Sequence, residues 1–124
     1  MNLNKITSEL ANSLKSKKVI FAIILFGSYA TGKQKPLSDV DICIITKKDI
    51  SLKEKVEIAG YASKKIDISF FWDMPPAIRY NVIKEGKILY NKNEAILHQA
   101  TVQTMSEYLD FKHIIDRRIA KVFG

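Results

Sequence analysis

Apolar residues recur with two different periods along this chain of 124 residues, and the two periods distinguish helices from strands. Near the N-terminus, Ile6, Leu10 and Leu14 return every four residues, with Leu3 just before them. This spacing predicts a helix over roughly residues 3–16. Residues 19–26 are instead a continuous run of β-branched and aromatic residues, which predicts a buried strand ended by Gly27.

The rest of the chain divides in the same way. Residues 28–38 contain Gly32, Pro36 and two serines, which favours a turn-rich loop or a short helix. We predict strands over residues 40–46, 65–72 and 88–90. Ser51, with Glu54 at capping-box spacing, predicts the start of a helix through about residue 62. A further helix is expected over residues 75–84, where a proline pair suits its first turn.

The last quarter of the chain, residues 93–122, contains neither glycine nor proline. Leu97, Met105, Leu109, Ile115 and Ile119 form a rough apolar stripe along it, which predicts one long helix or two shorter ones packed on the sheet. Because helices and strands alternate, we predict an α/β fold of one sheet covered by helices, formed by residues 1–124 as a single domain.

Composition excludes several classes of protein. The apolar fraction of 47% and the charged fraction of 27% are those of a globular chain rather than a disordered one. The single cysteine, Cys43, excludes an intramolecular disulfide and a cysteine-rich metal site. The longest apolar run, residues 19–26, is too short to span a bilayer, and the N-terminus lacks the pattern of a signal peptide. We therefore expect a cytoplasmic protein without a membrane partner.

The formal net charge of +7 favours anionic partners, such as nucleotides, nucleic acid or an acidic protein face. Most of the lysine pairs lie at predicted strand and loop ends, where solvated side chains are expected. The sequence has no RNP-like aromatic motif and no Cys/His finger, so sequence-specific binding of nucleic acid is not predicted.

Two acidic residues begin the second predicted strand. Side chains alternate faces along a strand, so Asp39 and Asp41 are expected on one face, with Val40 on the other. Paired carboxylates repel each other unless they are solvated or a cation lies between them. Mg²⁺ takes oxygen ligands, commonly one or two carboxylates together with substrate phosphates, so the pair suits a magnesium site.

Asp67 interrupts the apolar third strand, where burial would be unfavourable unless the acid were paired or metal-bound. If that strand lies beside the second, three carboxylates could hold two metal ions roughly 3.5–4 Å apart. Gly27 would let a phosphate approach the backbone, and Ser28 offers a hydroxyl and an N–H. Each signal also has an ordinary explanation: a turn, a solvated strand end, or an ion pair between Asp67 and Lys64 or Lys65.

Taken together, these segments resemble a known family. Gly27-Ser28 followed by Asp39-x-Asp41 is similar to the signature of the DNA-polymerase-beta-type nucleotidyltransferases. The stretch GSYATGKQKPLSDVDICII, with the later KIDISFF and EGKILYN, resembles the minimal nucleotidyltransferases in particular, and the similarity covers nearly the whole chain.

The resemblance implies a mixed β-sheet of about four strands with packed helices. It also implies that Gly27 and Ser28 bind the triphosphate, that Asp39 and Asp41 ligate the metals, and that Asp67 ligates the second metal and helps to deprotonate the acceptor. Mg²⁺ and ATP would then be cofactor and substrate. Such proteins often act as antitoxins that transfer AMP to a tyrosine of a HEPN toxin, which would make this toxin the partner.

Three hypotheses for function remain open at this point. The first is an adenylyltransferase that acts on a protein hydroxyl. The second is a binding module that neutralises a partner by docking. The third is a nucleotidyltransferase for a small molecule or an RNA end, for which a homo-oligomer could complete the acceptor site. The nucleotide, the acceptor and the oligomeric state do not follow from the sequence.

Overall fold

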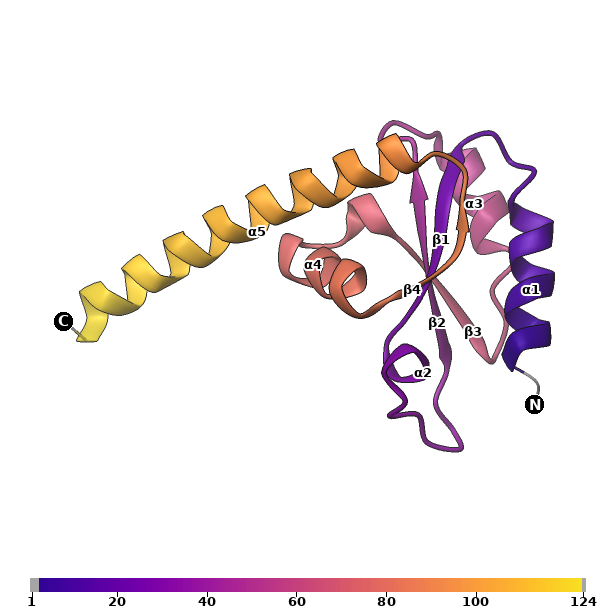
Figure 1. The fold of residues 1–124 in the computed structure, drawn as a ribbon, viewed down its shortest axis with the longest axis horizontal. Coiled ribbons are helices and arrows are strands. Elements are labelled where there is room, and N and C mark those ends of the chain that lie inside the picture. The colour runs from indigo at the N-terminus through magenta and orange to yellow at the C-terminus, as the bar shows by residue number, and fades with distance from the viewer. Residues whose placement is uncertain (1–2, 124) are drawn as a thin grey trace.

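The computed structural model describes residues 3–123 and has the predicted alternation of helices and strands (Figure 1). Its strands are β1 (Ile20–Phe26), β2 (Val40–Thr46), β3 (Ile66–Phe70) and β4 (Lys87–Asn91). Its helices are α1 (Leu3–Leu14), α2 (Ser28–Thr31), α3 (Leu52–Ala59), α4 (Pro76–Glu85) and α5 (Glu94–Phe123), with a single 3₁₀ turn η1 (Phe71–Asp73).

The four strands form one mixed sheet in the order β3-β2-β1-β4. β2 and β3 are parallel, whereas β1 runs antiparallel to both β2 and β4. The two central strands are almost completely buried because helices cover both of their faces. This explains why both read as continuous apolar runs.

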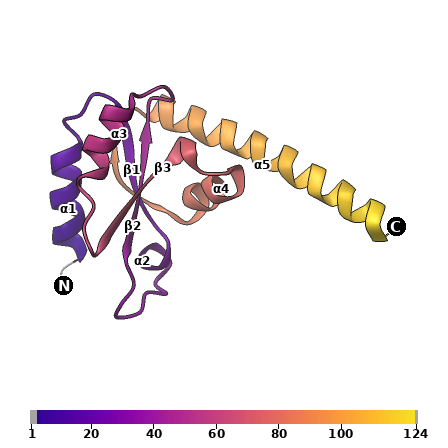
Figure 2. The same cartoon turned by 180° about the vertical axis from the view of Figure 1, so that it is seen from behind.

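Each face of the sheet carries its own apolar core. One core joins β1 and β2 to α1 and α3 through Leu10, Leu14 and Ile58. The other joins the opposite face to η1, α4 and α5 through Phe71, Val82 and Ala100. In Figure 2, α1 and α3 lie on one side of the strands and α4 on the other.

Local signals account well for the helix boundaries. Ser51 accepts a hydrogen bond from the Glu54 N–H while the Glu54 carboxylate accepts one from the Ser51 N–H, so the predicted capping box is present. Pro76 occupies the first turn of α4, and α4 ends at Glu85, with Gly86 as the cap residue that follows. α3 ends earlier than predicted, at Ala59 rather than near residue 62.

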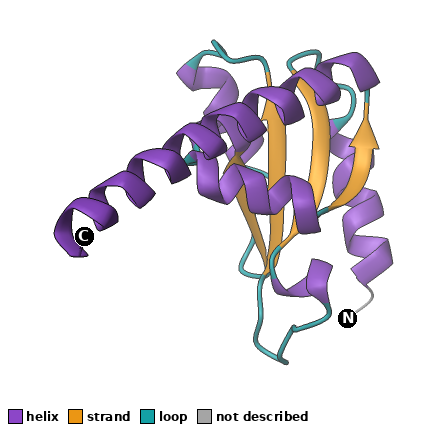
Figure 3. Cartoon of the chain, turned by 60° about the vertical axis from the view of Figure 1, so that its left-hand side comes forward, coloured by secondary structure: helices purple, strands orange, loops and turns teal. Residues whose placement is uncertain are grey.

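Two predictions in the second half of the chain were wrong. The third strand ends at Phe70 instead of continuing to residue 72, because Phe71 turns into the core beneath α4 and is fully buried there. The C-terminal segment is one helix, but only its first half packs on the sheet and on α4; the second half projects beyond the rest of the molecule (Figures 1 and 3). Among the residues that the structure describes, no helix combines the length and the apolar character needed to cross a bilayer.

Candidate active site

The three predicted acids lie at the starting ends of β2 and β3. Asp41 is the second residue of β2, and its register partners are Phe26 at the end of β1 and Asp67 in β3. Register partners in a sheet point to the same face, so Asp41 and Asp67 lie side by side. Asp39 comes two residues before Asp41, at the entrance to the strand. The sequence predicted that Asp67 could join the other two acids only if the third strand lay beside the second, and β3 does lie beside β2.

The three carboxylates differ in exposure. Asp41 is half-buried between the neighbouring strands, whereas Asp39 and Asp67 are exposed. Asp67 avoids burial although its neighbours are apolar, because β3 is an edge strand. The site is therefore open to solvent and to a large substrate.

Negative charge accumulates around Asp41. Partial burial, followed by the charges of Asp67 and Asp39, raises the pKa of the Asp41 carboxyl. None of the ion pairs among the described residues involves any of these three acids, so the alternative pairing of Asp67 with Lys64 or Lys65 is not formed. No cationic side chain of the described residues forms an ion pair with the cluster, which favours the binding of a cation there.

Gly27 lies directly against Asp41. Its φ of 74° is in the left-handed region that favours glycine, and a Cβ at this position would overlap the Asp41 Oδ2 atom. The sequence suggested that glycine leaves room for a phosphate. The structure shows a more immediate reason, because the Asp41 carboxylate itself occupies that space. Gly27 thus allows β1 to end beside the acid.

Ser28 opens the short helix α2 and is half-buried. Its carbonyl accepts hydrogen bonds from the N–H groups of Gly32 and Lys33, which closes the turn and leaves the Ser28 side chain at the start of the helix. Tyr29, the next residue, packs against the core shared with α1 and α3.

One positioning residue was not recognised from the sequence. The Lys65 ammonium donates to the Pro36 carbonyl at 3.4 Å, and the Lys65 carbonyl accepts from the Val40 N–H at 2.7 Å. Through these two hydrogen bonds, Lys65 holds the loop before Asp39 and the first residue of β2 against the start of β3. The two partners are 29 and 25 positions away along the chain, and no local pattern indicates such a tether.

The donors suit a hard cation, since all three are carboxylates and no described cation competes for them. As placed, however, no three His, Cys, Asp or Glu side chains among the described residues converge closely enough to hold a metal. The backbone sets Asp41 and Asp67 in register, Asp39 comes two residues before Asp41, and the side chains of Asp39 and Asp67 are exposed.

The family model described as "Polymerase beta, Nucleotidyltransferase" matches residues 8–95, a range that includes all five predicted site residues. From Methanocaldococcus jannaschii, "Putative protein adenylyltransferase MJ1547" is 34% identical over 71 residues, 57% of this chain. "Putative protein adenylyltransferase MJ0604" is 35% identical over 108 residues, 73% of this chain and 100% of its own length. The first of these matches spans only 56% of that relative's length.

Solved structures share the fold across the whole chain. A chain in a crystal structure of a toxin–antitoxin with AMP-PNP superposes with a TM-score of 0.73 at 23% identity, with 100% of both chains covered. A chain in the complex of tri-AMPylated Shewanella oneidensis HEPN toxin with MNT antitoxin gives a TM-score of 0.72 at 20% identity, with 98% of both chains covered. At these identities the likeness shows the fold.

Proposed function

This chain belongs to the polymerase beta nucleotidyltransferase family, and we propose that it is a Mg²⁺-dependent adenylyltransferase that transfers AMP from ATP to a partner protein. The observation that carries the proposal is the register that sets Asp41 beside Asp67, with Asp39 two residues before Asp41 and Gly27 against the Asp41 carboxylate. The names of the relatives, protein adenylyltransferases, support ATP as the donor and a protein as the acceptor.

We propose a HEPN-type toxin as the acceptor, with this chain as its antitoxin. Support comes from the structures that share its fold, which include a complex of an AMPylated HEPN toxin with an MNT antitoxin. A tyrosine is the proposed target residue. Its phenol, with a pKa near 10, gives up a proton more readily than an aliphatic hydroxyl, so a carboxylate can assist its ionisation more easily.

Each site residue then has a definite role. Asp39, Asp41 and Asp67 would hold Mg²⁺, which would neutralise charge on the triphosphate during displacement at the α-phosphate. Asp67, at the exposed edge strand, accepts the proton of the acceptor hydroxyl. The Ser28 hydroxyl and N–H donate to the phosphates. The acceptor oxygen forms its bond to the α-phosphorus as the bond to pyrophosphate breaks, and pyrophosphate leaves.

The test uses ATP labelled on the α-phosphate, Mg²⁺ and, as acceptor, a purified HEPN-type toxin from the same organism as this chain. We expect label on a tyrosine of that protein with the wild-type chain. The Asp39→Asn/Asp41→Asn variant should reduce the rate by at least about 10³-fold, since it removes the charge that holds the metal. Label that persists with this variant would refute the proposal.

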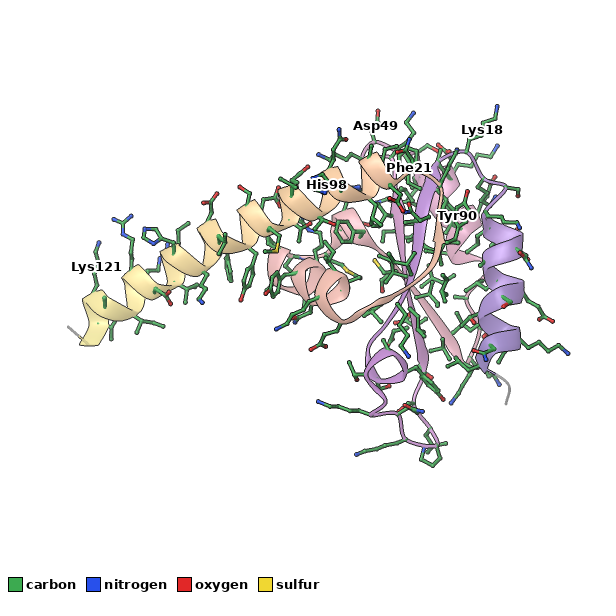
Figure 4. All side chains as sticks on the ribbon, in the orientation of Figure 1. Lys18, Phe21, Asp49, Tyr90, His98 and Lys121 are labelled. Atoms are coloured by element: carbon green, nitrogen blue, oxygen red, sulfur yellow. The ribbon has the colours of Figure 1, made fainter. Side chains whose placement is uncertain are left out.

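A matched control changes the charge equally at the other end of the sheet. Asp49 and Glu94 are exposed residues after β2 and at the start of α5, respectively (Asp49 is labelled in Figure 4). The Asp49→Asn/Glu94→Gln variant also removes two negative charges, but away from the acid cluster. It should transfer label to the partner at the wild-type rate. A comparable loss in this control would mean that overall charge, rather than the acid cluster, drives transfer.

A second candidate, neutralisation by docking alone, is favoured by the projecting half of α5. It predicts that the Asp39→Asn/Asp41→Asn variant still inhibits the partner fully although it transfers no label. Transfer to a small hydroxylated acceptor or an RNA end in the absence of the partner would instead support the third hypothesis.

A further inference from the structure

One face of α5 changes its surroundings halfway along the helix. With 3.6 residues per turn, Leu97, Ala100, Thr104 and Tyr108 lie along a single stripe. In the first half this stripe is covered: Ala100 and Thr104 are buried against the sheet and α4, and the Tyr108 ring stacks on Tyr80 with ring centroids 4.2 Å apart.

The same stripe continues without cover. Its next members are Phe111, Ile115, Ile119 and Val122, which are 47%, 39%, 51% and 75% exposed. No side-chain hydrogen bond, ion pair or ring contact within the described chain joins residues 109–122 to another element. Figures 1 and 2 show this half of α5 extending away from the sheet from both sides.

An uncovered apolar stripe of this length is unfavourable in water. Isolated helices of roughly 12–15 residues are only marginally stable, and a contiguous apolar surface marks an interaction site. The helix is about 45 Å long, and nearly half of it gains nothing from the rest of this chain. A second molecule that buries the stripe would supply the missing stabilisation.

The charges beside the stripe indicate what kind of molecule would bury it. Residues 109–122 carry four cations, Lys112, Arg117, Arg118 and Lys121, against two acids, Asp110 and Asp116. On a helical projection Lys112 and Arg118 flank the stripe on its two sides. We propose that this half of α5, residues 109–122, is a docking arm for an acidic protein partner, whose apolar helical groove buries the stripe while acidic side chains at its rim pair with Lys112 and Arg118.

A second copy of this chain fits less well. Self-association through the stripe would bring two basic segments together, in a chain whose net charge is already +7. Like charges across an interface disfavour that partner, whereas opposite charges favour association and speed it. The arm therefore selects an acidic partner over its own copy.

The arm also lies apart from the acids. Asp41 and Asp67 are at the starting ends of β2 and β3, whereas α5 follows the finishing end of β4, which runs in the same direction as β2. Docking and chemistry therefore use separate surfaces and can be tested separately. The inference rests on the proposed function only for the choice of probe, a purified HEPN-type toxin from the same organism as this chain.

The experiment measures binding of that protein without nucleotide, by calorimetry and by sedimentation. An Ile115→Asp/Ile119→Asp variant should weaken binding by at least about 100-fold, because it places two charges in the centre of the buried stripe. Ala120→Asp/His113→Asp places two acids on the opposite side of the same segment and should bind within about threefold of wild type. Circular dichroism should show all three chains equally folded.

A second pair of variants tests the charges. Lys112→Glu/Arg118→Glu should lower affinity by about tenfold or more and reduce its dependence on salt, while Arg117→Glu/Lys121→Glu, with the same change in net charge on the far side, should have a smaller effect. Equal effects of the two charge variants would overturn the assignment of the rim.

Three results would overturn the docking arm itself. They are no binding of the probe by the wild-type chain, unchanged binding by the Ile115/Ile119 variant, and a wild-type homodimer that this variant dissociates. The binding assay contains no nucleotide, so intact binding combined with absent label transfer counts against the proposed function alone.

Discussion

At the scale of single residues, the candidate site depends on the contact between Gly27 and Asp41. Gly27 adopts a positive φ, and its missing Cβ leaves the space that the Asp41 carboxylate fills. Asp41 is in turn the acid that Asp39 and Asp67 both influence. One glycine thus determines where the central carboxylate sits.

We predict that Gly27→Ala displaces the Asp41 carboxylate. The new methyl group would overlap it, and the positive φ would be strained by about 1 kcal/mol or more. AMP transfer should fall by at least about 100-fold, because small displacements of catalytic groups have large effects. The measurement is the labelling rate together with the melting temperature. Gly32→Ala is a control with a comparable φ of 75° but nothing within 4 Å of its Cβ, and it should lose stability but retain most of its activity.

Asp41 gives a prediction about pH. Its pKa is raised in the folded chain by burial and by Asp67 and Asp39, so protonation favours the folded state. This contribution is fully present below the pKa of the unfolded chain and is lost as pH rises through the higher, folded value. Asp41→Asn should therefore raise the melting temperature of the metal-free protein at pH 7 by about 1–4 °C, allowing for solvent screening, with no gain at pH 3.

The comparison needs chelator throughout, because a bound cation would reverse the effect of the charge. Asp110→Asn, on the exposed half of α5, is the matched control and should leave the melting temperature unchanged at both pH values. A lower melting temperature for Asp41→Asn at pH 7 would contradict the idea that this carboxylate is electrostatically strained.

At the scale of elements, a buried arginine joins three of them. Arg79 of α4 is only 6% exposed. Its guanidinium donates to the Met74 carbonyl, the Thr104 hydroxyl and the Glu107 carboxylate, and it lies over the rings of η1. Hydrogen bonds from Gln103 and Arg79 lower the pKa of Glu107. The first half of α5 is thereby fixed to α4 and η1.

Loss of this arginine should loosen α5. Arg79→Met keeps an apolar stem but leaves the Thr104 hydroxyl and the Met74 carbonyl without this donor, so we expect a loss of about 2–3 kcal/mol in the free energy of unfolding. Urea unfolding measures it. Glu107→Gln keeps a hydrogen-bond acceptor, and since the Glu107 side chain is 39% exposed it should lose less than about 1 kcal/mol. Equal losses of unfolding free energy in the two variants would mean that Arg79 stabilises the fold mainly through its ion pair with Glu107.

At the scale of the whole molecule, α5 begins at the end of the sheet opposite the open acid cluster, and its projecting half extends away to one side of the sheet (Figure 1). This separation leads to a prediction about ligand binding. Mg²⁺ with a non-hydrolysable ATP analogue should raise the melting temperature of the wild-type chain and, by the same amount, that of Ile115→Asp/Ile119→Asp. The Asp39→Asn/Asp41→Asn variant should show little or no shift.

Differential scanning fluorimetry measures these shifts, and removal of Mg²⁺ by chelation should abolish most of them. A smaller shift in melting temperature for the Ile115→Asp/Ile119→Asp variant would show that the α5 stripe and the nucleotide site are coupled. An undiminished shift in the Asp39/Asp41 variant would show that nucleotide binds away from the acids.

Much of this architecture follows from local sequence, because helix periodicity, capping and apolar runs report forces between residues close along the chain. The capping box at Ser51 and the strand over residues 40–46 were predicted correctly for that reason. The pairing of Asp39 with Asp41 is likewise a local consequence of strand alternation.

The remaining features depend on contacts between distant residues, which only tertiary structure decides. Which strand lies beside β2, and so whether Asp67 joins the other acids, is set by the packing of the whole sheet. The same packing turns Phe71 out of the strand and into the core. The apolar stripe of α5 has the same periodicity along its whole length. The sheet and α4, however, cover only its first half. Periodicity records that a face is apolar, and the fold determines what covers it.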